Sequence, residues 1–317
     1  MLEVVFCNVG DGDACIIRER REGQKDFVLL VDAGRPALEY VPGSCRREAL
    51  YHLRELGVDR IDLCLITHLH IDHMGGLDNI LRHIPVTKIL SPYIPPEDGC
   101  FLEPPYETGN KRLIGLSHML NIWHDTVSLA RRLGTRTEKL EEGRTELTPA
   151  LALETSFPCR DGMLVQHQVF DNLYQGIENE YQTWYEASMN RNIFGPLNLL
   201  TYAGRRILLA ADVYAVEWEE TELAPCDILK LPHHGDPKSM TAYLCGRLHP
   251  RYAVASCQND PAAKKDRPNA DIVRMMQEGG AEVICTENKP LPTLGATTHR
   301  NVRFEISEEG AIACFAE

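Results

Sequence analysis

The chain has 317 residues, 44% hydrophobic and 25% charged, which is typical of a globular, enzyme-sized protein that can bury a substantial core. A formal net charge of −13 argues against a broad nucleic-acid groove, but it allows a small or single-stranded phosphodiester as a ligand. No apolar run could span a membrane, no basic signal-peptide region opens the chain, and the 11 cysteines form no C-x-x-C pair, so we expect a cytoplasmic protein with reduced thiols.

Residues 1–94 predict short strands with two helices between them. Apolar runs closed by Gly, Asp or Asn favour strands, whereas apolar residues at helical spacing favour helices. The expected strands are 2–9, 14–20, 26–34, 61–68 and 86–94, and the expected helices are 45–58 and 75–84. In the first helix Gly57 is placed as a C-terminal stop.

The sequence changes character after Pro95, where a proline-rich entry, a helix over 116–134 and an aromatic, polar stretch follow one another. A hairpin is then expected over 197–213, with its turn near Ala203 and Gly204. The remaining expected elements are strands 227–235, 252–257, 281–287 and 302–307, and a helix over 269–280. Two strand-rich halves on either side of residues 95–190 indicate two packed sheets with helices outside.

The segment THLHIDHMGG (67–76) concentrates three histidines and an aspartate. His68 and His70 are two residues apart after an apolar run, so both can point the same way, while Asp72 and His73 open a helix. Imidazole and carboxylate are ligands of zinc, manganese and iron. The spacing suits two neighbouring metals better than a merely polar turn, with His68 and His70 on one and Asp72 and His73 on the other.

This H-x-H-x-D-H segment resembles the signature of the metallo-β-lactamase superfamily, and more narrowly its ComEC-type branch. Four further segments are similar to that branch: CNVGDGDACII, LLVDAG, RRILLAADV and LKLPHHGD. The resemblance implies an α+β fold, the four-layer αββα metallo-β-lactamase sandwich, as a single domain over residues 1–317. Residues 95–190 would then be an insertion or lid between the halves, and a natural place for a protein partner to bind.

The resemblance also implies further site residues. Asp212 falls on the carboxylate that bridges the metals, and a strand-end carboxylate is costly to bury unless it meets a cation. His233 and His234 fall on a double histidine; we assign His234 to a metal and His233 to the substrate, although the two could be exchanged. For Asp13 and Asp32 two interpretations are about equally expected: a direct role at the site, or an indirect one in which a strand-end aspartate caps a turn or supports a ligand histidine.

The chain departs from the superfamily's pattern in the third motif and in a later loop. Its third motif often supplies a histidine, where this chain has Asn190 and Asn192, so the first metal would be weakly held or need a water ligand. Asn192 is therefore assigned near the metal or substrate. Arg267 stands where relatives often carry a histidine; it could grip a phosphate in bidentate fashion, or be a solvated loop charge.

Together these features predict a metal-dependent hydrolase with two divalent ions, zinc or manganese. A hydroxide between the metals would attack a phosphodiester in single-stranded nucleic acid or a nucleotide, with Asp72 and His233 as the catalytic residues. One alternative is a phosphocholine-type esterase. Another is a metal-binding scaffold or sensor that has lost the chemistry. No membrane association is expected.

Overall fold

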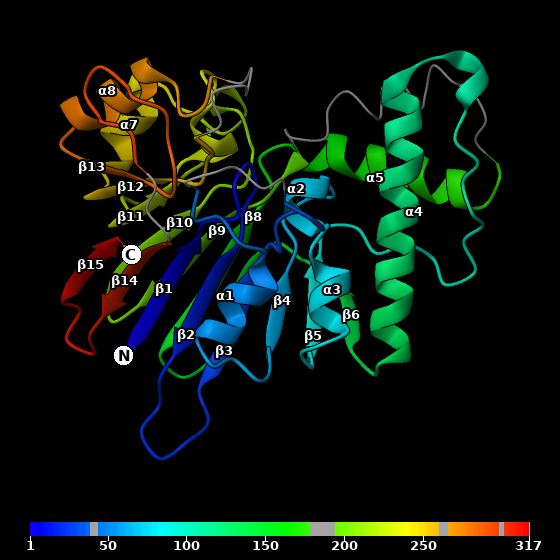
Figure 1. Cartoon of the computed structure of the whole chain (residues 1–317), viewed down its shortest axis with the longest axis horizontal. Coiled ribbons are helices and arrows are strands. Elements are labelled where there is room, and N and C mark those ends of the chain that lie inside the picture. The colour runs from blue at the N-terminus through cyan, green and yellow to red at the C-terminus, as the bar shows by residue number, and fades with distance from the viewer. Residues whose placement is uncertain (39–43, 178–193, 260–265, 298–300, 317) are drawn as a thin grey trace.

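The computed structural model describes residues 1–38, 44–177, 194–259, 266–297 and 301–316. Its strands form two sheets, in the orders β15-β14-β1-β2-β3-β4-β5-β6 and β13-β12-β11-β10-β9-β8-β7. The sheets pack against each other and helices lie outside them (Figure 1).

The first sheet joins the amino-terminal strands to the carboxyl-terminal hairpin. Neighbours from β3 to β6 are parallel, and the remaining pairs are antiparallel. Its strands are β1 (Leu2–Cys7), β2 (Cys15–Glu19), β3 (Phe27–Val31), β4 (Leu63–Leu65), β5 (Lys88–Ser91), β6 (Arg136–Lys139), β14 (Asn301–Ile306) and β15 (Ile312–Ala316).

The second sheet is antiparallel from β7 to β10 and parallel from β10 to β13. The predicted hairpin is confirmed: Tyr202 pairs with Arg205, and Ala203 and Gly204 form the turn with φ of 48° and 74°. Its strands are β7 (Gly143–Glu146), β8 (Leu151–Ser156), β9 (Leu197–Tyr202), β10 (Arg205–Leu209), β11 (Ile228–Lys230), β12 (Tyr252–Ala255) and β13 (Glu282–Cys285).

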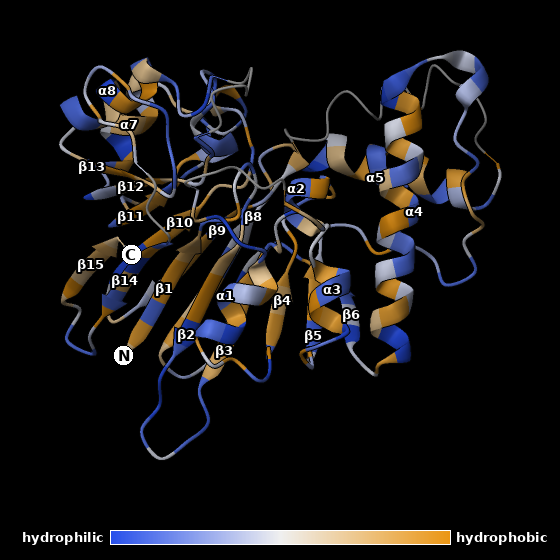
Figure 2. Ribbon diagram, in the orientation of Figure 1, coloured by the Kyte–Doolittle hydropathy of each residue, from blue (hydrophilic) through white to orange (hydrophobic). Residues whose placement is uncertain are grey.

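The central strands of each sheet are buried on both faces, and strand alternation divides the core into layers. In β1, Leu2, Val4 and Phe6 lie between the sheets, whereas Val5 and Cys7 face the helices. Figure 2 shows the resulting hydrophobic strands at the centre of the molecule. The hydrophobic core therefore has three layers, one between the sheets and one beneath the helices on each outer face.

Helices cover both outer faces. α1, α3 and α4 pack on the first sheet, and α7 and α8 on the second, so the predicted αββα arrangement is confirmed (Figure 1). The helices are α1 (Ala49–Glu55), α2 (Ile71–Met74), α3 (Leu77–Leu81), α4 (Lys111–Arg132), α5 (Arg160–Tyr174), α7 (Ala242–Leu248) and α8 (Ala270–Glu278). Short 3-10 turns occur at η1 (Tyr106–Thr108), η3 (Ala215–Glu217) and η4 (Pro232–Gly235).

The segment 95–190, predicted to be an insertion, contributes to both sheets. It supplies β6 at the edge of the first sheet, β7 and β8 at the edge of the second, and the helices α4 and α5. Much of this segment thus belongs to the sandwich, and its role as a lid stays a prediction. Across the described helices, none combines the length and apolar character needed to cross a membrane.

Candidate metal centre

The site residues lie at the carboxyl ends of parallel strands in both sheets. Asp32 directly follows β3, while His68 and His70 follow β4. From the second sheet, Asp212 follows β10 and the pair His233–His234 follows β11. Carboxyl ends of parallel strands form one edge of a sheet, so this topology brings residues distant in sequence to one seam between the sheets.

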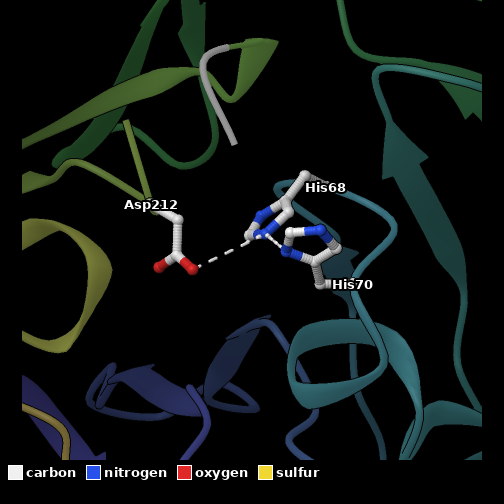
Figure 3. A group of neighbouring side chains, drawn as sticks. All are labelled: His68, His70 and Asp212. Carbon is white, nitrogen blue, oxygen red and sulfur yellow. Dashed lines mark hydrogen bonds and ion pairs between the residues drawn. The ribbon is translucent and has the colours of Figure 1, made fainter. Parts of the chain in front are cut away.

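One carboxylate oxygen lies at the centre of the cluster. Asp212 Oδ2 is 3.3 Å from His73 Nε2, 3.7 Å from His234 Nε2, and 3.8 Å from both His68 Nε2 and His233 Nε2. Figure 3 shows the Asp212 carboxylate facing His68 and His70, which come from a different segment of the chain. Asp212 is thus placed to contact two neighbouring cations at once.

Four sets of three side chains are potential ligand groups, and in each set the donor atoms lie within 4.8 Å of one another. Two sets contain the predicted metal ligands: His68, His70 and Asp212 for one ion, and Asp72, His73 and His234 for the other. The other two sets place Asp13 with Asp212 and His234, and with Asp32 and His73. The sequence-predicted metal ligands are therefore brought together in the pairing expected from their spacing.

The buried polar atoms of the cluster fit a cation. Among the described residues, His73 Nε2, His234 Nε2 and Asp212 Oδ1 are buried without a hydrogen-bond partner. Burial lowers the pKa of His234, but the carboxylates of Asp212 and Asp13 outweigh it and raise that pKa to about 9. Burial likewise lowers the pKa of His73, which Asp212 and Asp32 nevertheless raise well above its usual value. This excess of negative charge is what divalent ions would neutralise.

Backbone and carboxylate groups orient the ring nitrogens. Asp32 accepts hydrogen bonds from the backbone N–H and hydroxyl of Thr67, both at 2.8 Å, and lies 2.8 Å from His73 Nδ1. His234 Nδ1 lies 2.9 Å from the carbonyl oxygen of Ser256. Both rings therefore turn Nε2 toward Asp212.

A buried lysine holds the carboxylate of Asp13. Lys230 Nζ forms an ion pair with Asp13, donates to the carbonyl of Ala211 at 3.3 Å, and lies 4.0 Å from Asp212 Oδ1. Burial lowers the pKa of Lys230, but Asp13 and Asp212 raise it above its usual value. Sequence reasoning did not place Lys230 at the site. The only signal is its position in the buried strand ILK, where an unpaired charge would be costly.

Arg267 reaches the centre from the loop before α8. Its guanidinium contacts His233 Nε2, lies 3.6 Å from Asp11 Oδ1, and lies 3.5 Å from Asp236 Oδ2. Its side chain is 10% exposed, so the interpretation as a solvated loop charge is wrong. Burial lowers the pKa of His233 to about 4. Asp212 opposes this shift, whereas Arg267 adds to it.

Several residues of the site have a left-handed backbone. Asp32, Ala211, His233 and His234 have φ of 59°, 44°, 48° and 59°. Such conformations cost free energy in residues that carry a Cβ and cluster at functional sites. Asn190 and Asn192 lie outside the described residues.

Known proteins resemble this chain in sequence over part of its length and in fold over most of it. Residues 9–152 match the model of the metallo-beta-lactamase superfamily. The octanoyltransferase of Porphyromonas gingivalis is 33% identical over 63 residues, which are 20% of this chain and 12% of that protein. The chain thus spans only a small part of that relative.

Two solved structures resemble the whole chain. One is Igni18, a metallo hydrolase from Ignicoccus hospitalis, which is 16% identical with a TM-score of 0.50 and a coverage of 96% of this chain and 100% of that chain. The other is the metallo-beta-lactamase fold protein YhfI from Bacillus subtilis, 9% identical with a TM-score of 0.46, covering 99% of both chains. At 16% identity the first likeness concerns the fold.

Proposed function

Since the chain has the metallo-beta-lactamase fold and matches that superfamily over residues 9–152, we propose that it is a metal-dependent hydrolase of phosphodiesters. The observation that carries this proposal is the position of Asp212 Oδ2, within 3.8 Å of four histidine Nε2 atoms. A scaffold without chemistry has no need of two complete groups of ligand residues around one carboxylate.

The chain's own residues would hold two divalent ions. His68, His70 and Asp212 form one group, and Asp72, His73 and His234 form the other, with Asp212 shared between them. Zinc or manganese ions bound there would lower the pKa of a water molecule and offset the negative charge of a phosphate. Asp32 and the Ser256 carbonyl would keep the rings in the orientation that this requires.

Two groups favour a phosphate ester as the substrate. Arg267 can donate two parallel hydrogen bonds to phosphate oxygens, which a bare metal site cannot do. His233, which Arg267 contacts, is placed to bind the phosphate. Igni18, a metallo hydrolase, is compatible with hydrolysis but does not specify the substrate.

The test is cleavage of a labelled single-stranded oligonucleotide and of bis(p-nitrophenyl) phosphate with added Mn²⁺ or Zn²⁺. Wild type is compared with Asp72→Asn and with Asp78→Asn, a matched change at an exposed ion pair on α3. We expect metal-dependent cleavage that falls at least about 100-fold in Asp72→Asn, on the scale of a lost metal-holding group, and persists in Asp78→Asn.

Other outcomes discriminate the alternatives. Activity confined to p-nitrophenyl phosphocholine would favour the phosphocholine-type esterase. Absence of any cleavage by protein shown to carry metal would contradict the proposal. Absence of both cleavage and metal would favour the scaffold.

A further inference from the structure

A polar cavity of about 280 Å³ adjoins the metal centre on the side of Asp72. It is lined by Gly10, Asp11, Arg35, Arg46 and Gln258, among others. Ligand pockets generally start at about 300 Å³, so this cavity can hold one part of a ligand.

Arg46 is fixed at the back of the cavity by three contacts. Its Nε donates to Ser44 Oγ at 2.9 Å, its Nη1 to Gln258 Oε1 at 3.2 Å, and its Nη2 to Glu287 Oε1 at 3.1 Å. An arginine has five N–H donors, so these contacts with described residues leave two for a ligand. Gly10 packs closely against this side chain, which is 6% exposed, and a Cβ there would lie 3.3 Å from Arg46 Cδ.

Arg35 connects the cavity to the metal centre. Its Nε donates to the backbone carbonyl of Asp11 at 2.9 Å, and its Nη2 lies 3.6 Å from Asp11 Oδ2 and 3.8 Å from Asp72 Oδ2. The side chain is 35% exposed, so it can reach a ligand with little desolvation. A group bound by Arg35 therefore lies next to whatever Asp72 contacts.

Each arginine of the cavity is held by a carboxylate and keeps donors for a ligand. Asp11 is shared between Arg35 and Arg267 at 3.6 Å from each, and Glu287, which pairs with Arg46, is buried behind it. The cavity therefore offers a ligand the N–H donors of two guanidinium groups, without a net positive charge. Guanidinium groups bind phosphate in bidentate fashion, so these donors suit a phosphate.

We propose that this cavity binds a second phosphate group of the substrate, adjacent to the phosphodiester at the metal centre. The inference rests on the proposed function and narrows its substrate to nucleotides that carry a neighbouring phosphate. Arg35 and Arg46 would hold that second phosphate, and Arg267 and His233 would face the one that is cleaved.

The experiment uses two substrates that differ by one phosphate: thymidine 5′-(p-nitrophenyl phosphate) and its 3′-phosphorylated form. Metal-loaded wild type is expected to cleave the 3′-phosphorylated form with a kcat/KM about tenfold higher, the effect of one charge-assisted contact. Arg35→Ala should reduce this preference to roughly twofold or less, whereas Arg144→Ala, an exposed arginine on β7, should retain it.

A second readout does not depend on turnover. Calorimetric affinities for thymidine 3′,5′-bisphosphate and thymidine 5′-monophosphate should show the same preference in wild type and its loss in Arg35→Ala. Arg46→Lys, which keeps the charge facing Glu287, should also weaken the preference.

The outcomes separate the two proposals. Cleavage of both esters with equal kcat/KM, together with equal affinities for the two nucleotides, would overturn the second-phosphate site and leave the hydrolase. Cleavage of neither ester would overturn the proposed function, and the affinity comparison would then decide the anion site on its own.

Discussion

Lys230 and Asp13 form a buried ion pair at the base of the metal centre, with side chains only 5% and 10% exposed. The negative charge of Asp13 is therefore neutralised by Lys230 and does not depend on a metal ion for its counter-charge. Burial raises the pKa of Asp13, but Lys230 and His234 outweigh it and hold that pKa below its usual value. Asp13 thus acts as a counter-ion that fixes Lys230 beside Asp212.

Replacing this lysine should destabilise the fold. Lys230→Met leaves the carboxylate of Asp13 buried without its partner, so the free energy of unfolding of the metal-free protein should fall by about 3–5 kcal/mol. Urea denaturation measures the change. The double variant Lys230→Met/Asp13→Asn should recover part of the loss, and failure to do so would mean that the pair is not the source of the effect.

The two tandem histidines should differ in what they hold. His234 Nε2 is 3.7 Å from both Asp72 and Asp212, so His234→Ala should lose about one bound metal ion per chain, measured by elemental analysis. His233→Ala should retain its metal and lose activity, because its ring contacts Arg267. The reverse pattern would exchange the two assignments.

Stability should depend on pH through His167 on α5. Burial, with a smaller effect of Lys139, lowers the pKa of His167 to about 4. The unfolded chain, with a pKa near 6.5, binds the proton first as the pH falls, so stability is lost from about pH 6.5 down to about pH 4. His167→Gln should remove roughly 2 kcal/mol of the drop in unfolding free energy between pH 7 and pH 5. An unchanged pH profile would contradict this.

Replacement of two glycines by alanine should change stability in opposite directions. A Cβ at Gly76 would lie 2.1 Å from the carbonyl oxygen of Ala33, so Gly76→Ala should destabilise by about 2 kcal/mol or more. A Cβ at Gly115 on α4 would meet no atom within 4 Å, and Gly115→Ala should stabilise by about 1 kcal/mol through helix propensity. Thermal denaturation of both variants tests the contrast.

The sequence predicts what its local patterns encode. The hairpin at Ala203 and Gly204 follows from turn chemistry, and the histidine motif from its spacing. The edge strands β6 and β7 were missed because RTEK and GRTE are largely exposed and lack apolar alternation. β6 and β7 join the sheets through backbone pairing with the adjacent strands β5 and β8, and not through a pattern in their own side chains.

The site's long-range partners could not be predicted. Arg46 meets Glu287 across 241 positions of sequence. Arg35 follows LLVDAG and Asp72 lies in the histidine motif, but no local pattern pairs the two residues. In the sequence these arginines cannot be told from surface arginines, because their contacts depend on segments that only the folded chain brings together.

The left-handed residues of the centre have a consequence for engineering. His233, His234, Asp32 and Ala211 each keep a conformation that glycine would adopt without strain, at a cost of order 1 kcal/mol or more apiece. Selection of variants for thermostability should therefore favour substitutions at these positions, because His233→Gly or Ala211→Gly relieves backbone strain. The same changes would take away or loosen the groups around Asp212, so thermostability and turnover should be traded against each other at this seam.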